Sequence, residues 1–253
     1  MRTGEIGAQA EFAMRLLAEA GIVPGLRVLD AGCAAGTLSR LIASIVGESG
    51  EVVGVDKHST MINVARELTE EMGHKNVTFV EGELDDVVPT LGQFDAVAGR
   101  RILMYLSNPV DTLGVLRSAL KPGGVAVFQE SDATLVPGSI EPMPLHDQVT
   151  GWIWKAAEME GADLHMGFKL PALFHEALFT VDSFRAEPVL ELPGTENAMV
   201  YKVRQMIPQI LWHKVASLED LGVETLAYRL SEERSPDKVY VSDMAFGITG
   251  RKP

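Results

Sequence analysis

The most constraining feature of this sequence is the stretch 28–37, which reads Val-Leu-Asp-Ala-Gly-Cys-Ala-Ala-Gly-Thr. Its first two residues are apolar, as in a strand that is buried on both faces. Every residue from 32 to 36 is small, so a ligand could approach the backbone there. Apolar residues then recur at helical spacing from Leu38 to Ile45. A strand, a small-residue turn and a helix N-terminus predict a βα unit that binds a nucleotide.

Strand and helix signals alternate along the first half of the chain. We expect strands, each a short apolar run, at about 26–31, 51–56, 77–80, 94–98 and 125–129. We expect helices at about 5–20, 37–46, 59–72 and 109–120. Only a turn of helix fits the Pro-interrupted segment 84–92, and Lys-Pro-Gly-Gly at 121–124 predicts a turn before the fifth strand. These alternations predict the α/β class with a doubly wound parallel sheet.

The pattern changes after residue 130. Residues 131–144 hold three prolines and predict a loop. We expect helices at about 145–160 and 170–178, a helical insertion at about 195–230, and strands at 181–192 and 239–248. Pro188 favours a sheet edge for the first of these strands. The expected fold is a seven-stranded, mostly parallel sheet with an antiparallel strand near the C-terminus.

We interpret residues 1–253 as one domain with a cofactor-binding core at 22–130. The helical insertions, at 131–180 and 194–236, would form a lid over the carboxyl ends of the strands, where ligands of such sheets bind. Helical lids of this kind often pair across a dimer, so a homodimer is a possible assembly.

Composition narrows the partners and the compartment. The net charge is −13 and the longest basic cluster is Arg100-Arg101, whereas a protein that grips nucleic acid usually carries a basic face. No apolar run approaches the roughly 20 residues needed to span a bilayer, and the N-terminus lacks a signal-peptide apolar core. We therefore expect no nucleic acid, no membrane and a cytoplasmic location. The single cysteine, Cys33, rules out an intrachain disulfide.

The glycine-rich turn does not match the motifs of other nucleotide sites. Nicotinamide cofactors require G-x-G-x-x-G, and Thr37 stands where the third glycine belongs. A dinucleotide pyrophosphate is therefore disfavoured, although a nucleotide-dependent oxidoreductase on a similar sheet stays an alternative. The Walker pattern is also absent, since no Gly-Lys-Ser/Thr follows.

Residues 28–36 resemble the first motif of class I S-adenosylmethionine-dependent methyltransferases, which reads hydrophobic-hydrophobic-Asp-x-Gly-x-Gly-x-Gly. Further blocks resemble later motifs of that family in the same order, at 53–61, 80–83, 94–97 and 120–124. The resemblance covers about 22–130 and the final strand. It implies S-adenosylmethionine as the cofactor and methyl transfer as the activity.

The resemblance also implies roles for single residues. Asp56 would accept hydrogen bonds from both ribose hydroxyls, Met61 would pack on the adenine, and Glu83 would meet the adenine amino group. Asp30 would orient the loop or the ammonium group of the cofactor, and Arg100 would contribute its backbone carbonyl. The expected cofactor-binding residues are Asp30, Gly32, Cys33, Ala34, Gly36, Asp56, Lys57, Met61, Gly82, Glu83, Leu84 and Arg100.

Ala34 departs from this motif, because the family usually has glycine at this position. A methyl group there is tolerated if the residue keeps a negative φ, but it narrows the pocket. This departure keeps open a catalytically silent binding protein of the same fold.

Several classes of methyl acceptor are disfavoured. Adenine- and cytosine-directed members of the family carry Asn/Asp-Pro-Pro-Tyr after the fourth strand, whereas residues 99–102 read Gly-Arg-Arg-Ile. Glu130 and Asp132 offer carboxylates only at the end of the fifth strand, so we expect no metal. A small aromatic or hydrophobic acceptor remains. Apolar side chains that could contact it, or simply pack the lid, are Trp152, Trp154, Met159, Met166 and Phe168.

Two side chains are candidates for catalysis. His146, beside Asp147 at the start of the first lid helix, is the first choice for a general base. His175 and His213 rank lower. Tyr105 follows the fourth strand and could face the acceptor, although a core tyrosine would have the same signature.

Overall fold

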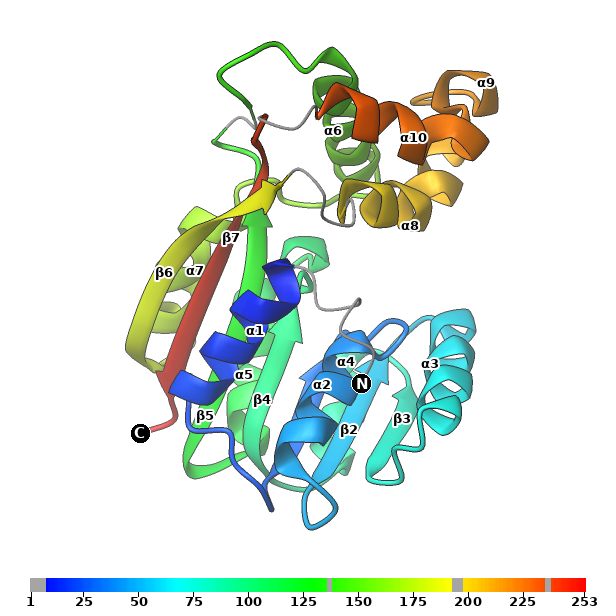
Figure 1. The fold of residues 1–253 in the computed structure, drawn as a ribbon. Helices are drawn as coiled ribbons and strands as arrows, with labels where there is room; N and C mark the ends of the chain where they lie inside the picture. The colour runs from blue at the N-terminus through cyan, green and yellow to red at the C-terminus, as the bar shows by residue number, and fades with distance from the viewer. Residues whose placement is uncertain (1–7, 136–137, 193–197, 235–237) are drawn as a thin grey trace. The chain divides into compact units, whose positions relative to one another are not determined.

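The computed structural model describes residues 8–135, 138–192, 198–234 and 238–253. Its strands form a seven-stranded sheet in the order β3-β2-β1-β4-β5-β7-β6 (Figure 1). The strands are β1 (Arg27–Ala31), β2 (Glu51–Asp56), β3 (Val77–Glu81), β4 (Phe94–Arg100), β5 (Leu120–Asp132), β6 (Thr180–Glu191) and β7 (Tyr240–Arg251).

Ten α-helices occur in the described residues. They are α1 (Ala8–Glu19), α2 (Thr37–Val46), α3 (Ser59–Glu71), α4 (Leu84–Val87), α5 (Pro109–Ala119), α6 (Pro144–Met159), α7 (Met166–Glu176), α8 (Ala198–Trp212), α9 (Leu218–Leu221) and α10 (Val223–Glu233). Two 3₁₀-helices, η1 (Val88–Thr90) and η2 (Leu103–Tyr105), flank β4. No described helix combines the length and the apolar character needed to cross a membrane.

The strand order reverses at β1, which pairs in parallel with β2 on one side and with β4 on the other. Parallel pairing continues from β2 to β3 and from β4 to β5, and β7 runs opposite to both of its neighbours (Figure 1). The predicted fold class is confirmed, including the antiparallel strand near the C-terminus. Because the residues at 28–31 are almost completely buried, β1 has the two-sided burial that its apolar sequence predicts.

The chain divides into two compact units. The sheet unit comprises residues 13–130, 166–185 and 246–253, and the helical unit comprises residues 1–12, 131–165 and 186–245. The helical unit has its own apolar core, to which α6, α8 and α10 contribute Val149, Val203 and Leu226. The helix α7 falls in the sheet unit, where Phe174 meets Phe128 of β5 edge to face. The function of the helical insertions as a lid stays a prediction.

Three local predictions were wrong. Residues 121–124 do not precede β5 but lie within it, because the β4–β5 register shifts between Phe94 and Ala96 and accommodates the extra residues as an irregularity. At its other end β5 continues to Asp132, so the predicted loop begins later. The helix expected at 170–178 begins four residues earlier, at Met166.

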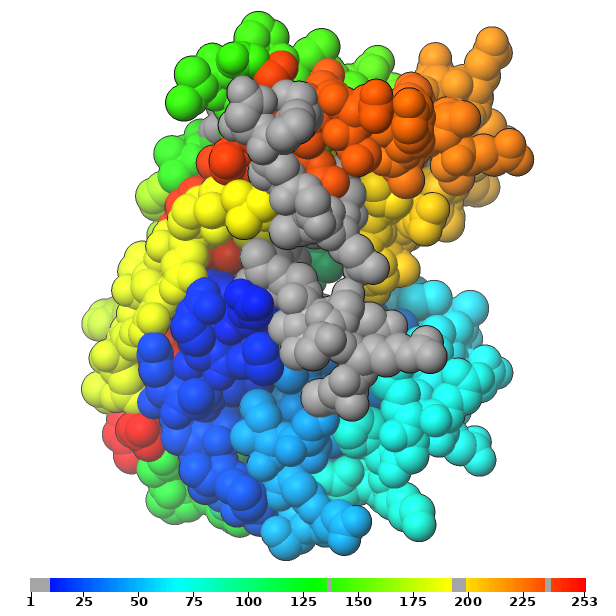
Figure 2. Space-filling view, in the orientation of Figure 1, coloured from blue at the N-terminus to red at the C-terminus, as the bar shows by residue number. Residues whose placement is uncertain are grey.

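The strand β6 lies at one edge of the sheet, as Pro188 predicts. In Figure 2 this strand, coloured yellow, is visible at the molecular surface. Val181, Phe184 and Leu190 are each about two-fifths exposed there. The backbone groups on one side of an edge strand have no neighbouring strand to pair with. A proline nitrogen on that side therefore costs the sheet no hydrogen bond.

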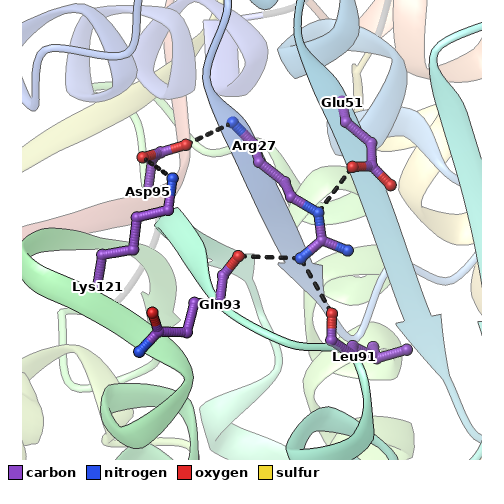
Figure 3. Close-up of polar contacts among 6 residues, drawn as sticks. All are labelled: Arg27, Glu51, Leu91, Gln93, Asp95 and Lys121. Carbon is purple, nitrogen blue, oxygen red and sulfur yellow. Dashed lines mark hydrogen bonds and ion pairs between the residues drawn. The ribbon is translucent and has the colours of Figure 1, made fainter.

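At the amino ends of the strands, Arg27 joins β1 to its surroundings (Figure 3). Its guanidinium group donates to Glu51 Oε2 at 2.7 Å and to the carbonyls of Leu91 and Gln93 at 3.0 Å each. Its backbone N–H donates to Asp95, which also accepts from Lys121 Nζ at 2.6 Å. A single side chain thus fixes β2, the segment before β4, and β1.

We expect Arg27→Met to lower the free energy of unfolding by about 1–3 kcal/mol, because two carbonyls and a carboxylate lose a charged donor. Lys121→Met is the matched control at the same edge. It removes one half-exposed ion pair, and it should cost less than about 1 kcal/mol. Urea denaturation measures both, and equal effects would contradict this account of Arg27.

Candidate cofactor site

The loop 32–36 connects the carboxyl end of β1 to α2 and bends against the end of β2. The N–H groups of Gly32 and Cys33 both donate to the carbonyl of Val55, at 2.9 and 3.0 Å. Gly32 and Gly36 have φ values of +69° and +74°, a region that glycine adopts without strain. The loop therefore contains residues in the left-handed region of φ, and it lies at the carboxyl ends of the strands, where ligands of such sheets bind.

Glycine is required at two of these positions by the protein's own packing. A methyl group on Gly32 would lie 2.4 Å from Cδ1 of Ile102, and one on Gly36 would lie 2.8 Å from Cζ of Phe79. Both distances are far below a van der Waals contact. The small residues of the motif thus seat the loop against neighbouring side chains, in addition to any access that they give a ligand.

Ala34 does not keep the negative φ under which its methyl group was expected to be tolerated. Its φ is +45°, which costs an L-residue roughly 1–2 kcal/mol. The N–H of Ala34 donates to Asp56 Oδ2 at 2.9 Å, and this bond to a carboxylate stabilises the left-handed turn.

Asp56 lies against the loop, and the resemblance assigns both to the same cofactor. The second carboxylate oxygen of Asp56 accepts from the backbone N–H of His58 at 2.9 Å, at the N-terminus of α3. The His58 ring nitrogen Nδ1 lies 3.0 Å from the same oxygen. Asp56 therefore connects the end of β2 to the loop and to α3, and its side chain keeps 11% exposure.

The other residues predicted around the adenosine follow β2 and β3, either directly after the strand or on the next helix. Gly82 N–H donates to the Asp56 carbonyl at 3.0 Å, and Lys57 Nζ lies 3.5 Å from Glu83 Oε1. Both of these charged side chains are more than half exposed. Met61 is half-buried on α3, whereas Leu84 is buried. This end of the sheet therefore combines the exposed charges of Lys57 and Glu83 with the apolar side chains of Met61 and Leu84.

The side chains of Cys33, within the loop, and of Asp30, which precedes it on β1, are both buried. Cys33 packs with Ile62, Ala65 and Phe79, and this burial raises the pKa of its thiol, so the thiol stays protonated. Asp30 accepts a 2.5 Å hydrogen bond from Ser39 of α2. Burial raises the pKa of Asp30 to about 7, although the bond from Ser39 and the charge of Arg100 oppose the rise. The bond from Ser39 attaches the end of β1 to the helix that follows the loop. The two roles predicted for Asp30, toward the loop or toward the ammonium group of the cofactor, stay predictions.

Beyond β4, the structure contains an arrangement that the sequence did not predict. Arg100 ends β4 opposite Gln129 of β5, and Tyr105 ends η2 with 42% of its surface exposed. The carboxylate of Glu130 accepts from the N–H groups of Ile102 and Leu103 at 3.0 and 2.8 Å. The only sequence signal for this contact was an acidic residue at the end of an apolar strand.

His146 lies in the core of the helical unit and is fully buried. Its Nδ1 lies 2.6 Å from Glu233 Oε2, which also accepts the backbone N–H of His146 at 2.8 Å. Burial opposes ionisation of Glu233, but the hydrogen bonds from Leu145 and His146 outweigh it and lower its pKa. Nε2 of His146 has no hydrogen-bond partner in the described part of the chain. A catalytic function of His146 stays a prediction.

The remaining candidates are spread over both units. His175 is exposed on α7, and His213 Nε2 lies 2.5 Å from Glu160 Oε1. Trp152 packs against the core of the helical unit, whereas Phe168 of the sheet unit is half-exposed against Phe246, with ring centroids 4.9 Å apart. Among the described residues, no group of three His, Cys, Asp or Glu side chains is placed to hold a metal ion.

Comparison with known proteins identifies the family of this chain. A family profile described as "Methyltransferase domain" matches residues 22–174. The demethylmenaquinone methyltransferase of Lactococcus lactis is 33% identical over 120 residues, which are 46% of each chain. The ubiquinone/menaquinone biosynthesis C-methyltransferase UbiE of Ectopseudomonas mendocina is 37% identical over 105 residues, 41% of each chain. The chain thus spans less than half the length of these two relatives.

A solved structure shows the same fold. The S-adenosylmethionine-dependent methyltransferase of Aquifex aeolicus superimposes with a TM-score of 0.58 at 18% identity, over 95% of this chain and 89% of that one. At this identity the likeness concerns the fold alone.

The raised pKa of Asp30 predicts a pH-dependent cost. An acid whose folded-state pKa lies near 7, against about 3.8 unfolded, binds more protons when folded, so it lowers stability increasingly as pH rises from 4 to 7. Asp30→Asn keeps an acceptor for Ser39 without the charge. Its free energy of unfolding, measured in urea, should therefore rise relative to wild type between pH 4 and pH 8. A difference that does not change with pH would contradict the raised pKa.

Proposed function

This chain belongs to the methyltransferase-domain family, and from that premise we propose that it binds S-adenosylmethionine and transfers the methyl group to a small organic acceptor. The observation that carries the proposal is the direct bond between the loop and the carboxylate that ends β2, from Ala34 N–H to Asp56 Oδ2 at 2.9 Å. This bond brings together the two motifs that would hold the amino-acid part and the ribose of the cofactor.

The residues present suit this cofactor. A carboxylate offers about four acceptor positions, and Asp56 uses one for Ala34 and up to two for the exposed His58. Capacity remains for a ribose hydroxyl, and rotation of the His58 ring would free a second position. Glu83, with its side chain 60% exposed, can accept from an exocyclic amine. The bound cofactor would supply a methyl group activated by a sulfonium centre.

The contribution of the chain itself is then to orient the acceptor relative to the methyl group and to exclude water from the site. An in-line displacement requires the acceptor atom and the methyl group to be aligned, and such orientation can supply roughly 7–11 kcal/mol in favourable cases. A base is needed only where the acceptor loses a proton in the step, and it would add about 10²–10⁴-fold. We propose His146, oriented by Glu233, as the candidate for this base. We propose Tyr105 as a second side chain that contacts the acceptor.

For the acceptor we propose a hydrophobic aromatic molecule with an electron-rich ring, of the phenol or quinol class. Two observations support this choice. One relative is named a demethylmenaquinone methyltransferase and the other a ubiquinone/menaquinone biosynthesis C-methyltransferase. The helical insertions hold apolar side chains such as Trp154 and Met159, which are partly exposed. The net charge of −13 disfavours a nucleic-acid acceptor. We also propose a cytoplasmic location.

A second candidate is a protein that binds the cofactor without turnover. The strained φ of Ala34, at a position where the family usually has glycine, is the observation that favours it. A nucleotide-dependent oxidoreductase is no longer supported, since the chain belongs to a methyltransferase family.

Isothermal titration with S-adenosylhomocysteine tests the cofactor. We expect wild type to bind and Asp56→Ala to weaken binding at least tenfold, because both the ribose acceptor and the bond to Ala34 are lost. His58→Ala is the matched control, since it removes only a neighbouring side chain that is 64% exposed, and it should change the affinity less than threefold. Absence of heat with wild type would reject the proposal.

Incubation with labelled S-adenosylmethionine and a panel of phenols, quinols, indoles and amines tests turnover. We expect label in a phenol or quinol product. His146→Asn keeps a donor toward Glu233 but lacks Nε2, so it should lower turnover at least tenfold while cofactor affinity stays unchanged. Tyr105→Phe tests the hydroxyl in the same assay. Unchanged turnover in both variants would remove them as catalytic candidates, and no product with any acceptor would favour the silent protein.

A further inference from the structure

The buried carboxylate of Glu130 lies near the carboxyl end of β5 and has no role in the proposed function. The Glu130 side chain is fully buried. Its Oε1 atom accepts two consecutive backbone hydrogen bonds, from Ile102 at 3.0 Å and from Leu103 at 2.8 Å. It therefore caps η2 from a different strand and fixes the turn by which the chain leaves β4.

This arrangement costs stability. The second oxygen, Oε2, is buried and has no hydrogen-bond partner among the described residues, and an unpaired buried acceptor is unfavourable. Burial raises the pKa of Glu130 to about 7, although the two N–H donors and the charge of Arg101 oppose the rise. A glutamine would keep an oxygen acceptor for both N–H groups without the cost of burying a charge, so an acceptor of this length, and not its charge, is what the turn requires.

The turn that Glu130 holds packs against the cofactor loop through Ile102. Arg101 adopts a φ of +53° and donates its N–H to the Gln129 carbonyl at 2.8 Å, so the chain reverses immediately after β4. The next residue, Ile102, fills the space above Gly32, where an added methyl group would lie within 3 Å of three of its carbon atoms. Displacing Ile102 would leave the first residue of the loop without its support.

We propose that Glu130 is a positioning residue of the cofactor site, which acts by holding Ile102 against Gly32. The inference rests on the proposed function, because it assigns the loop 32–36 to a cofactor. Glu130 does not touch the cofactor in this scheme. It holds the side chain of Ile102 in the space next to Gly32, and its two bonds to consecutive N–H groups resist the displacement of Ile102.

The chain offers a control at the adjacent position. Gln129 is also buried on β5, and its Oε1 likewise lacks a partner in the described part of the chain. Successive side chains of a strand point to opposite faces, and Gln129 lines a small cavity with Ala13, Leu16 and Leu38. Gln129→Met therefore removes a similar buried group on the other face, away from Ile102.

The test measures the Kd for S-adenosylhomocysteine at 15 °C, with each variant first shown to be folded by circular dichroism. We expect Glu130→Met to raise Kd at least tenfold. Glu130→Gln retains an oxygen for both N–H groups and should stay within threefold of wild type, as should Gln129→Met. If Glu130→Met does not fold, Glu130→Asp replaces it. The shorter side chain keeps the charge but does not reach both N–H groups, and a loss of at least threefold is expected.

A double-mutant cycle tests whether Glu130 acts on the loop through Ile102. Ile102→Ala should raise Kd about tenfold, and combining it with Glu130→Met should add less than threefold, because both changes remove the same support. A purely structural role would give additive losses, and additive losses overturn the inference. Normal affinity in Glu130→Met overturns it also, while the proposed function stands. Failure of wild type to bind overturns the proposed function itself.

Discussion

The parallel pairing of β1 with β2 and β4 is the constraint on which the rest of the sheet unit depends. Val28 and Leu29 are fully buried between two neighbours, so the carboxyl ends of the three strands lie at one edge. The loop that leaves β1 must turn there, and its N–H groups reach the carbonyl of Val55 and the carboxylate of Asp56. The composition of the glycine-rich stretch follows from this crowding, since Ile102 and Phe79 occupy the space that side chains would need.

The amino and carboxyl ends of the strands differ in how their charged groups are paired. At the amino edge, Arg27, Glu51, Asp95 and Lys121 form short bonds with complementary partners. At the carboxyl edge, Asp30 and Glu130 are buried and their pKa values are raised to about 7. Groups that cost stability are thus concentrated where a ligand would bind, which is typical of functional sites. The amino edge stabilises the fold that carries this cost.

The sequence predicted the sheet from its periodicity, and the resemblance assigned the loop and Asp56 to one cofactor site, although the hydrogen bond between them was not predicted. It did not predict the left-handed φ of Ala34 or the bond from Glu130 to the turn after β4. Both depend on residues that are distant in the chain, and no local pattern encodes such a pairing. The burial of His146 was missed for the same reason, since Glu233 lies 87 positions away. The irregularity at 121–124 was read as a turn because proline and glycine signal both.

The division into two units has a consequence for how the chain could unfold or evolve. The chain passes between them at 12–13, 130–131, 165–166, 185–186 and 245–246, and all but the third of these crossings fall inside a helix or a strand. No flexible linker separates the units at those four points. Melting of the helical unit would therefore remove part of β5, β6 and β7. For the same reason, exchange of the helical unit as a module would replace parts of three of the seven strands.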